Sequence, residues 1–154
     1  MSDYFLDASA LVKAYVEERG SAHVRSLLAM SPAITSELTI AEIASALGRR
    51  MIDGALTVSR RDELFRAFMR EALDFRLVAV SQDVLARAAD MLLKGVPGYV
   101  LRTSDAIHLA TAEYSFILAG ATGSDGGGVV ASDQRMLRVA MARGLSTDDP
   151  ESFE

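Results

Sequence analysis

The chain has 154 residues, of which 50% are hydrophobic and 24% charged, the size and balance of one ordinary globular domain. It contains no cysteine, which excludes a disulfide framework, a Cys-ligated zinc site and thiol catalysis. Its 21 acidic and 16 basic residues give a formal net charge of −5, the wrong sign for a protein that coats nucleic acid by charge alone. A nuclease whose acids gather in one cluster is still compatible with this charge.

The first residues, MSDYFLDASALVK, lack a basic segment, and acids interrupt their apolar run, so they do not form a signal peptide. No stretch approaches the roughly 20 apolar residues that a membrane helix needs. We therefore expect no membrane association and, by default, a cytoplasmic location.

Short apolar runs alternate with segments of helical pattern along the chain. The predicted strands are Tyr4–Leu6, Ala33–Thr35, Leu77–Val80, Val129–Ala131 and Leu145–Thr147, with Leu77–Val80 buried and Leu145–Thr147 at an edge. The predicted helices are Ala8–Val16, Ser21–Met30, a helix capped by Ser36, Ser59–Asp74, Gln82–Leu93, Ser104–Ala119 inside the fold, and Gln134–Ala142.

This alternation predicts an α/β fold with a mostly parallel sheet. No repeat or linker divides the chain, so we expect a single domain over residues 1–154. The glycine-rich segment Gly120–Gly128 is interpreted as an inserted loop of unassigned role, because only a strand and a helix of the same sheet follow it.

Four acids occupy positions where a ligand site of such a sheet would lie. Asp7 follows the first strand, Asp133 closely follows Val129–Ala131, and Asp105 opens the buried helix. These positions matter because ligands bind at the carboxyl ends of parallel strands. Glu42 lies opposite the apolar stripe of its helix and shares a face with Ser45 and Arg49, so it faces a cleft or solvent.

Each acid also has a structural explanation. Asp7, Asp105 and Asp133 stand at helix starts, where an acid satisfies free N–H groups and the helix dipole, and Glu42 could belong to a solvated face. Converging carboxylates repel one another and persist where a cation is held. All-oxygen ligands favour Mg²⁺ or Mn²⁺, ions that serve phosphodiester hydrolysis.

Other chemistries have little support. The sequence lacks GxxxxGK[ST], GxGxxG, GxSxG and HExxH. Of the two histidines, His23 is expected on a solvated helix surface. His108 shares the face of Asp105 and is interpreted as a packing residue or a neighbour of the site, with direct contact to the site as the alternative.

At these acids the sequence resembles a known family. The segment YFLDASALVK at residues 4–13 resembles the opening of a PIN-domain ribonuclease, and it is most similar to the VapC toxins of bacterial toxin–antitoxin pairs. Residues 35–43, 101–110 (LRTSDAIHLA) and 131–137 (ASDQRML) resemble the second, third and fourth motifs of that family, in the right order.

The resemblance implies a three-layer α/β/α sandwich with a central sheet of four to five strands. It also implies a divalent metal, cleavage of RNA, inhibition by a cognate antitoxin, and a homodimer. It gives the catalytic and metal-binding roles to Asp7, Glu42, Asp105 and Asp133. Ser9 matches a polar position near the metal, although a hydroxyl at a helix start explains it equally well.

The sequence departs from the family at the last motif, where Ala131 stands in place of a frequent Thr or Ser. The neighbouring Ser132 then becomes the candidate for the hydroxyl near the metal. Arg49 and Arg50 are the candidates for RNA phosphate contact, with solvated surface charge as the alternative, and Lys13 is a weaker candidate. The sequence thus predicts a Mg²⁺- or Mn²⁺-dependent ribonuclease. A non-catalytic RNA- or protein-binding module and a metal-dependent phosphohydrolase of small molecules are the competing interpretations.

Overall fold

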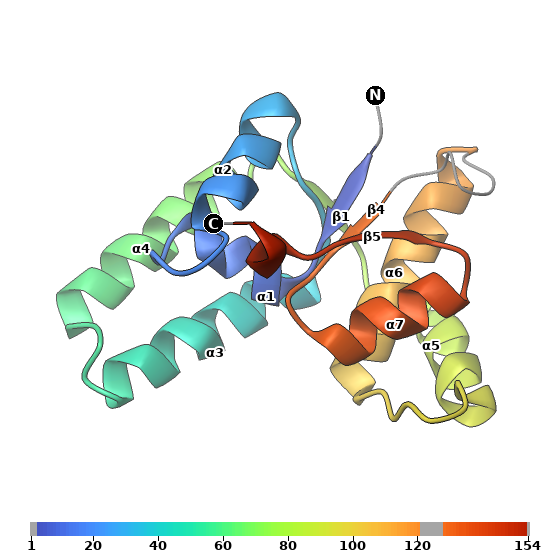
Figure 1. Cartoon of the computed structure of the whole chain (residues 1–154). Helices are drawn as coiled ribbons and strands as arrows, with labels where there is room; N and C mark the ends of the chain where they lie inside the picture. The colour runs from blue at the N-terminus through green and yellow to red at the C-terminus, as the bar shows by residue number, and fades with distance from the viewer. Residues whose placement is uncertain (1–2, 121–127, 154) are drawn as a thin grey trace.

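The computed structural model describes residues 3–120 and 128–153, in which short strands alternate with helices (Figure 1). The strands are β1 (Tyr4–Leu6), β2 (Ile34–Ser36), β3 (Arg76–Val78), β4 (Gly128–Val130) and β5 (Ser146–Asp148). The α-helices are α1 (Ala8–Leu11), α2 (Ser21–Met30), α3 (Leu38–Ile52), α4 (Val58–Glu71), α5 (Gln82–Lys94), α6 (Thr103–Leu118) and α7 (Gln134–Ala142). The described residues also contain the 3₁₀ turns η1 (Val12–Ala14) and η3 (Pro150–Ser152).

The strands of the described residues form one parallel sheet in the order β3-β2-β1-β4-β5. The chain builds outward from β1 through β2 to β3, then crosses to the other side of β1 and adds β4 and β5. The strand order therefore reverses between β1 and β4. In open α/β sheets, a reversal of this kind leaves a crevice outside the carboxyl ends of the strands, where ligands bind.

Helices cover both faces of this sheet, which makes the fold a three-layer sandwich. On one face, α1, α2, α3 and α4 enclose a core that includes Leu6 of β1 and Val130 of β4. On the other face, α5, α6 and α7 enclose a second core with Phe5 and Val129. Neighbouring residues of β1 and β4 thus point to opposite cores, as the two-residue period of a strand requires. Figure 1 shows the two helical layers on either side of β1, β4 and β5.

The predicted fold class is confirmed, and so is the burial of the helix after residue 103. Eight residues of α6 are buried, because this helix packs on the sheet and on α5 at once. The predicted edge strand near residue 146 is also present as β5.

Three local predictions are wrong. Helical composition predicts one helix over Ala8–Val16, but α1 ends at Leu11 and the chain tightens into η1, a frequent ending of short helices. The Leu77–Val80 segment is predicted as a buried strand, but β3 is a half-buried edge strand with Arg76 exposed.

The third wrong prediction concerns the start of α3. Ser36 ends β2 instead of capping the helix, and Glu37 takes the cap position without a side-chain hydrogen bond. The Ser36 hydroxyl still accepts a hydrogen bond from the Leu38 N–H at 3.2 Å. The residue type thus signals a helix start, but the strand extends one position further than the pattern indicates.

Of the predicted Gly120–Gly128 loop, residues 121–127 lie outside the described residues, and Gly128 already belongs to β4. No helix in the described ranges combines the length and apolar character that crossing a membrane requires.

Candidate functional site

The four acids predicted from the sequence line one pocket of about 450 Å³ at the carboxyl ends of β1 and β4. Asp7 directly follows β1, and Asp133 follows β4 and precedes α7. Glu42 reaches the pocket from α3, and Asp105 reaches it from the first turn of α6. The pocket therefore lies where the strand order reverses, as the sheet topology leads one to expect.

Asp7 is the most buried of these acids, with a relative exposure of 5%. Its carboxylate accepts hydrogen bonds from the Ala10 N–H at 2.9 Å and from the Ser9 hydroxyl at 2.8 Å. Burial raises the pKa of Asp7 above its ordinary value, and the neighbouring charge of Glu42 raises it further, while His108 and the two hydrogen bonds oppose the rise. Asp7 is thus a fixed carboxylate whose negative charge is only partly compensated.

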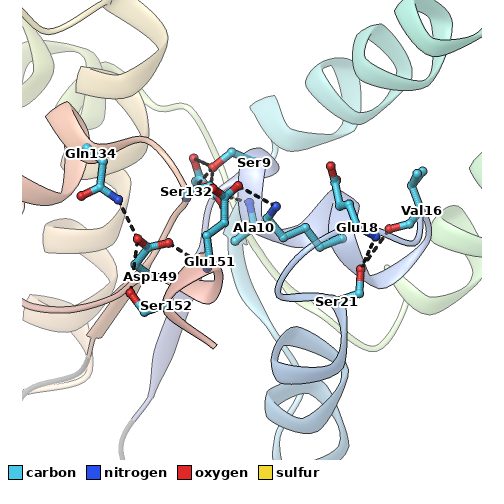
Figure 2. Close-up of polar contacts among 12 residues, drawn as sticks. Ser9, Ala10, Val16, Glu18, Ser21, Ser132, Gln134, Asp149, Glu151 and Ser152 are labelled. Atoms are coloured by element: carbon cyan, nitrogen blue, oxygen red, sulfur yellow. Dashed lines mark hydrogen bonds and ion pairs between the residues drawn. The ribbon is translucent and has the colours of Figure 1, made fainter. Parts of the chain in front are cut away.

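Ser9 ties the two central strand ends together. Its hydroxyl donates to Asp7 and accepts a hydrogen bond from the Ser132 N–H at 2.9 Å, so the segment after β4 is held against the start of α1. Figure 2 shows Ser9 and Ser132 next to each other in this arrangement. The structure therefore places both predicted serines beside the acids, although the Ser9 side chain also serves the helix start.

A second buried contact fixes the position of β2 and α3 relative to Asp7. The Thr35 hydroxyl, fully buried, donates to the Leu6 carbonyl at 2.6 Å and bonds the Thr39 hydroxyl at 2.7 Å. The backbone just before Asp7 is thereby connected to the helix that carries Glu42. These bonds satisfy polar groups that would otherwise be buried without partners.

Glu42 is held by His108, a residue of α6 that is 2% exposed. The Nε2 atom of His108 lies 2.5 Å from Glu42 Oε2, and the Phe5 ring packs edge-on against the imidazole at 6.1 Å between ring centroids. Burial by itself lowers the pKa of His108, but the hydrogen bond to Glu42 and the charge of Asp7 raise it overall. His108 is therefore packed in the core and also contacts Glu42 in the pocket.

Asp105 and Asp133 form a second pair, joined by Arg102. The guanidinium of Arg102 lies 3.3 Å from Asp133 Oδ2 and 3.9 Å from Asp105 Oδ2. Burial raises the pKa of Asp105, and the charge of Asp133 raises it further, while Arg102 opposes both. The two carboxylates are thus close enough to repel each other, and Arg102 is the cation that compensates them.

Helix capping and pocket lining coexist at the three aspartates. Asp7 caps α1, and Asp133 caps α7 by accepting from the N–H groups of Arg135 and Met136 at 2.9 and 3.1 Å. Asp105 is the third residue of α6 and interacts with the backbone N–H at the cap residue Arg102, the position of the acid in a capping box. Capping accounts for where each acid stands, but not for why all of them face one pocket with Glu42.

The donor set of this pocket suits a hard divalent cation, because it offers carboxylate and hydroxyl oxygens. The buried Ser132 hydroxyl has no hydrogen-bond partner among the described residues and lines the same pocket. Within the described ranges, no three acidic or histidine side chains are already arranged to hold a metal ion. Instead, Glu42 is paired with His108, and the Asp105–Asp133 pair is compensated by Arg102.

The far side of the pocket is basic. Arg49 is exposed and bonds the Ser45 hydroxyl at 2.7 Å, whereas Arg50 makes a two-pronged contact with Glu18 at 3.0 and 3.2 Å. Lys13 also lines the pocket. The predicted arginines thus lie across the pocket from the Asp105–Asp133 pair, and Arg49 is the more available of the two.

Comparison with known proteins decides the family. Residues 4–141 match the PIN domain. The chain belongs to the PIN-domain family. It is 31% identical over 151 residues to Ribonuclease VapC46 of Mycobacterium tuberculosis, covering 97% of this chain and 99% of that protein.

Solved structures show the same PIN fold. A toxin–antitoxin complex from Klebsiella pneumoniae aligns with a TM-score of 0.63 at 18% identity, covering 97% of this chain and 98% of that one. Mycobacterium tuberculosis VapC20, described as a toxin that cleaves the sarcin–ricin loop, aligns with a TM-score of 0.65 at 18% identity, covering 89% and 95%. The resemblance to PIN domains read from the four motifs is confirmed.

Sequence reasoning did not assign a role to Arg102 in this PIN-domain pocket. Arg102 precedes Asp105 by three residues, the spacing at which side chains of one helical turn meet, so a signal for the contact with Asp105 was present. Its contact with Asp133 depends on α6 and β4 coming together in the fold. Lys13 is buried, and Glu151 lines the same pocket. Neither fact could be predicted from the residues adjacent to them in the sequence.

Proposed function

We propose that this PIN-domain protein is a metal-dependent endoribonuclease that hydrolyses RNA phosphodiester bonds as the toxin of a toxin–antitoxin pair. The observation that carries this proposal is the convergence of Asp7, Glu42, Asp105 and Asp133 on one pocket at the reversal of strand order. The relative named as a ribonuclease, which aligns over nearly its full length, supports the same activity.

In this proposal Asp7 and Asp105 hold Mg²⁺ or Mn²⁺, assisted by Glu42 and Asp133. Such an ion, when bound, activates a water molecule and balances the charge that develops on the phosphorus oxygens. The protein's own contribution is to hold the ligands still. Asp7 is fixed by an N–H group and a hydroxyl, and His108 fixes Glu42, so little reorganisation is needed.

The basic side of the pocket then contacts the RNA backbone. Arg49 is exposed, and among the described residues its guanidinium contacts only the neutral Ser45 hydroxyl, so it can bind a phosphate without losing an ion pair there. Arg50 must first give up its contact with Glu18. Arg102 is exposed over most of its side chain and stands at the pocket edge, where it can turn toward a phosphate.

The same proposal includes a cognate antitoxin as protein partner, because the Klebsiella structure with this fold is a toxin–antitoxin complex. A homodimer, a cytoplasmic location and a single domain over residues 1–154 remain predictions. Size-exclusion chromatography with light scattering tests the dimer directly.

The decisive experiment compares RNA cleavage by the purified wild type with cleavage by Asp7→Asn and Asp105→Asn. Total RNA is incubated with the protein in Mg²⁺, in Mn²⁺ and with chelator, and the new RNA ends are mapped. We expect wild-type cleavage that chelator stops and that each substitution abolishes. Asp90→Asn is the matched control, because it makes the same chemical change on the exposed surface of α5, outside the pocket.

Two outcomes would favour the competing functions. RNA binding without metal-dependent cleavage would indicate a non-catalytic module, and hydrolysis of a nucleoside monophosphate without RNA cleavage would indicate a small-molecule phosphohydrolase. Unchanged cleavage by Asp7→Asn would remove the four-acid site from the mechanism.

A further inference from the structure

Lys13 is a buried lysine on the wall of the pocket that holds the four acids. It belongs to η1 and is 3% exposed, whereas the other lysine of the chain, Lys94, lies on the surface. A buried ammonium is costly unless an anion compensates it. Lys13 therefore needs a negatively charged partner inside or beside the pocket.

That partner comes from the far end of the chain. The ammonium nitrogen of Lys13 lies 2.9 Å from Glu151 Oε1, and this is its hydrogen-bond contact among the described residues. Glu151 is carried by the 3₁₀ turn η3, and half of its side chain is exposed at 47%. The ion pair thus joins a buried cation to a carboxylate that remains open to solvent.

The turn that presents Glu151 is well fixed in the molecule. Asp149 caps it by accepting from the Glu151 N–H at 2.9 Å, and Gln134 donates to Asp149. On the other side, Gly20 lies so close to the Pro150 carbonyl that a Cβ at this position would come within 2.5 Å of it. Figure 2 shows Asp149 and Glu151 on this turn, near Ser9 and Ser132. The family match ends at residue 141, so this turn lies beyond the matched segment.

The contact that Glu151 makes with Lys13 is of a kind that an RNA phosphate could also make. A carboxylate and a phosphate offer a lysine the same thing, negatively charged oxygens at hydrogen-bond distance. Glu151 can be displaced because it is exposed, whereas Lys13 is fixed by burial. Lys13 lines the same pocket as the four acids, so a phosphate bound to Lys13 would lie beside those acids.

We propose that Lys13 anchors a backbone phosphate of the RNA beside the four-acid pocket, and that Glu151 holds this position until the RNA displaces it. The inference rests on the proposed function, since it names a contact of the same substrate. Lys13 supplies sequence-independent affinity, because phosphate contacts position a nucleic acid without reading its bases.

A purely structural ion pair makes a different prediction from a displaceable one. If the Lys13–Glu151 pair only fastens the C-terminal turn, removing either partner loosens the same contact, and RNA binding changes little or in the same direction for both. If Glu151 competes with RNA, removing the lysine weakens binding and removing the glutamate strengthens it. The opposite signs distinguish the two roles.

The test measures binding of a short fluorescein-labelled single-stranded RNA by fluorescence anisotropy, in chelator so that metal-dependent cleavage does not occur. The variants are Lys13→Met, which keeps the aliphatic stem, Glu151→Gln, and both together. We expect Lys13→Met to weaken binding roughly tenfold, the effect of losing one charged hydrogen bond, and Glu151→Gln to strengthen it several-fold. The double variant should behave like Lys13→Met. The dependence of log affinity on log salt should flatten by about 0.7 in Lys13→Met, as for one lost phosphate contact.

The ion pair Lys94–Asp90 on the surface of α5 supplies matched controls. Lys94→Met and Asp90→Asn change the net charge by the same amounts outside the pocket and should leave RNA affinity nearly unchanged. Melting temperatures of all variants check folding, and Glu151→Gln tests the proposal alone if Lys13→Met does not fold. RNA binding that Glu151→Gln leaves unchanged or weakens would overturn this inference without touching the proposed function. Failure of the wild type to bind RNA in chelator at any salt concentration would overturn this inference, whereas the proposed function is tested separately by metal-dependent cleavage.

Discussion

Asp7→Asn should make the protein more stable without metal and less stable with it. Asn accepts a helix-cap hydrogen bond about as well as Asp, so the bond from the Ala10 N–H is retained. The substitution removes the negative charge of the Asp7 carboxylate, and the pKa of this carboxyl is raised in the folded protein by burial and by Glu42. Each unit of such a rise costs the ionised folded state about 1.4 kcal/mol, so removing the charge stabilises the metal-free protein at neutral pH.

With a divalent ion the order should reverse. An ion at 100 times its dissociation constant stabilises the folded wild type by about 2.7 kcal/mol. For a chain of this size this corresponds to a rise in melting temperature of about 5–11 °C. Asp7→Asn should lose most of that rise, because it removes one of the proposed ligands.

The assay is thermal unfolding of both proteins in chelator and across a series of Mg²⁺ and Mn²⁺ concentrations, with Asp90→Asn as the control. A variant that is more stable than the wild type in chelator but less stable with metal indicates that Asp7 belongs to a cation site and is not only a helix cap. An equal metal-induced rise in wild type and Asp7→Asn would refute the reasoning, as would a variant that is clearly less stable than the wild type in chelator.

Three further predictions follow from the same geometry. Without metal, the stability contributed by protonated Asp7 and Asp105 is present below pH 3.8 and is lost as the pH rises through their raised folded-state pKa values. Urea unfolding should therefore show the free energy of unfolding falling as the pH rises from 3.8 through these pKa values, and Mg²⁺ should make this fall smaller. Thr35→Val leaves two buried hydrogen-bond partners unsatisfied and should cost about 1–3 kcal/mol in urea unfolding, whereas Thr35→Ser should cost less. Gly20→Ala places a side chain at a φ of 85° and against the Pro150 carbonyl, so it should lower the free energy of unfolding by about 1–3 kcal/mol. Hydrogen exchange should show that the amides of the C-terminal turn lose protection, and unchanged protection would contradict the close packing.

The sheet and its layers could be predicted from the sequence because strands and helices leave periodic patterns. The strand run at residues 4–6 and the buried helix at residues 103–118 have compositions that admit few other structures. The position of β3 could not be predicted in the same way. An apolar run of four residues reads as buried, and only the order of strands, which is a property of the whole sheet, places Arg76–Val78 at the edge.

The candidate site could be predicted as far as residues that follow strands or open helices. Asp7, Asp105 and Asp133 occupy positions that the pattern marks, and Glu42 lies on the polar face of its helix. The partners that hold them come from distant segments. The contacts of His108 with Glu42, 66 residues apart, and of Lys13 with Glu151, 138 residues apart, exist only once the chain is folded.

The charges that line the pocket explain how an acidic protein could bind an RNA substrate. In the described part of the chain, six carboxylates and four basic side chains line the pocket, which leaves −2 before His108 is counted. A divalent cation at the proposed site would cancel that charge, and the carboxylates of Glu18 and Glu151 already compensate Arg50 and Lys13. RNA can then exchange its phosphates for these carboxylates at no net change in the number of ion pairs. Affinity of this kind is weak and falls as the salt concentration rises, so the −5 charge of the chain disfavours indiscriminate RNA coating but not cleavage at this pocket.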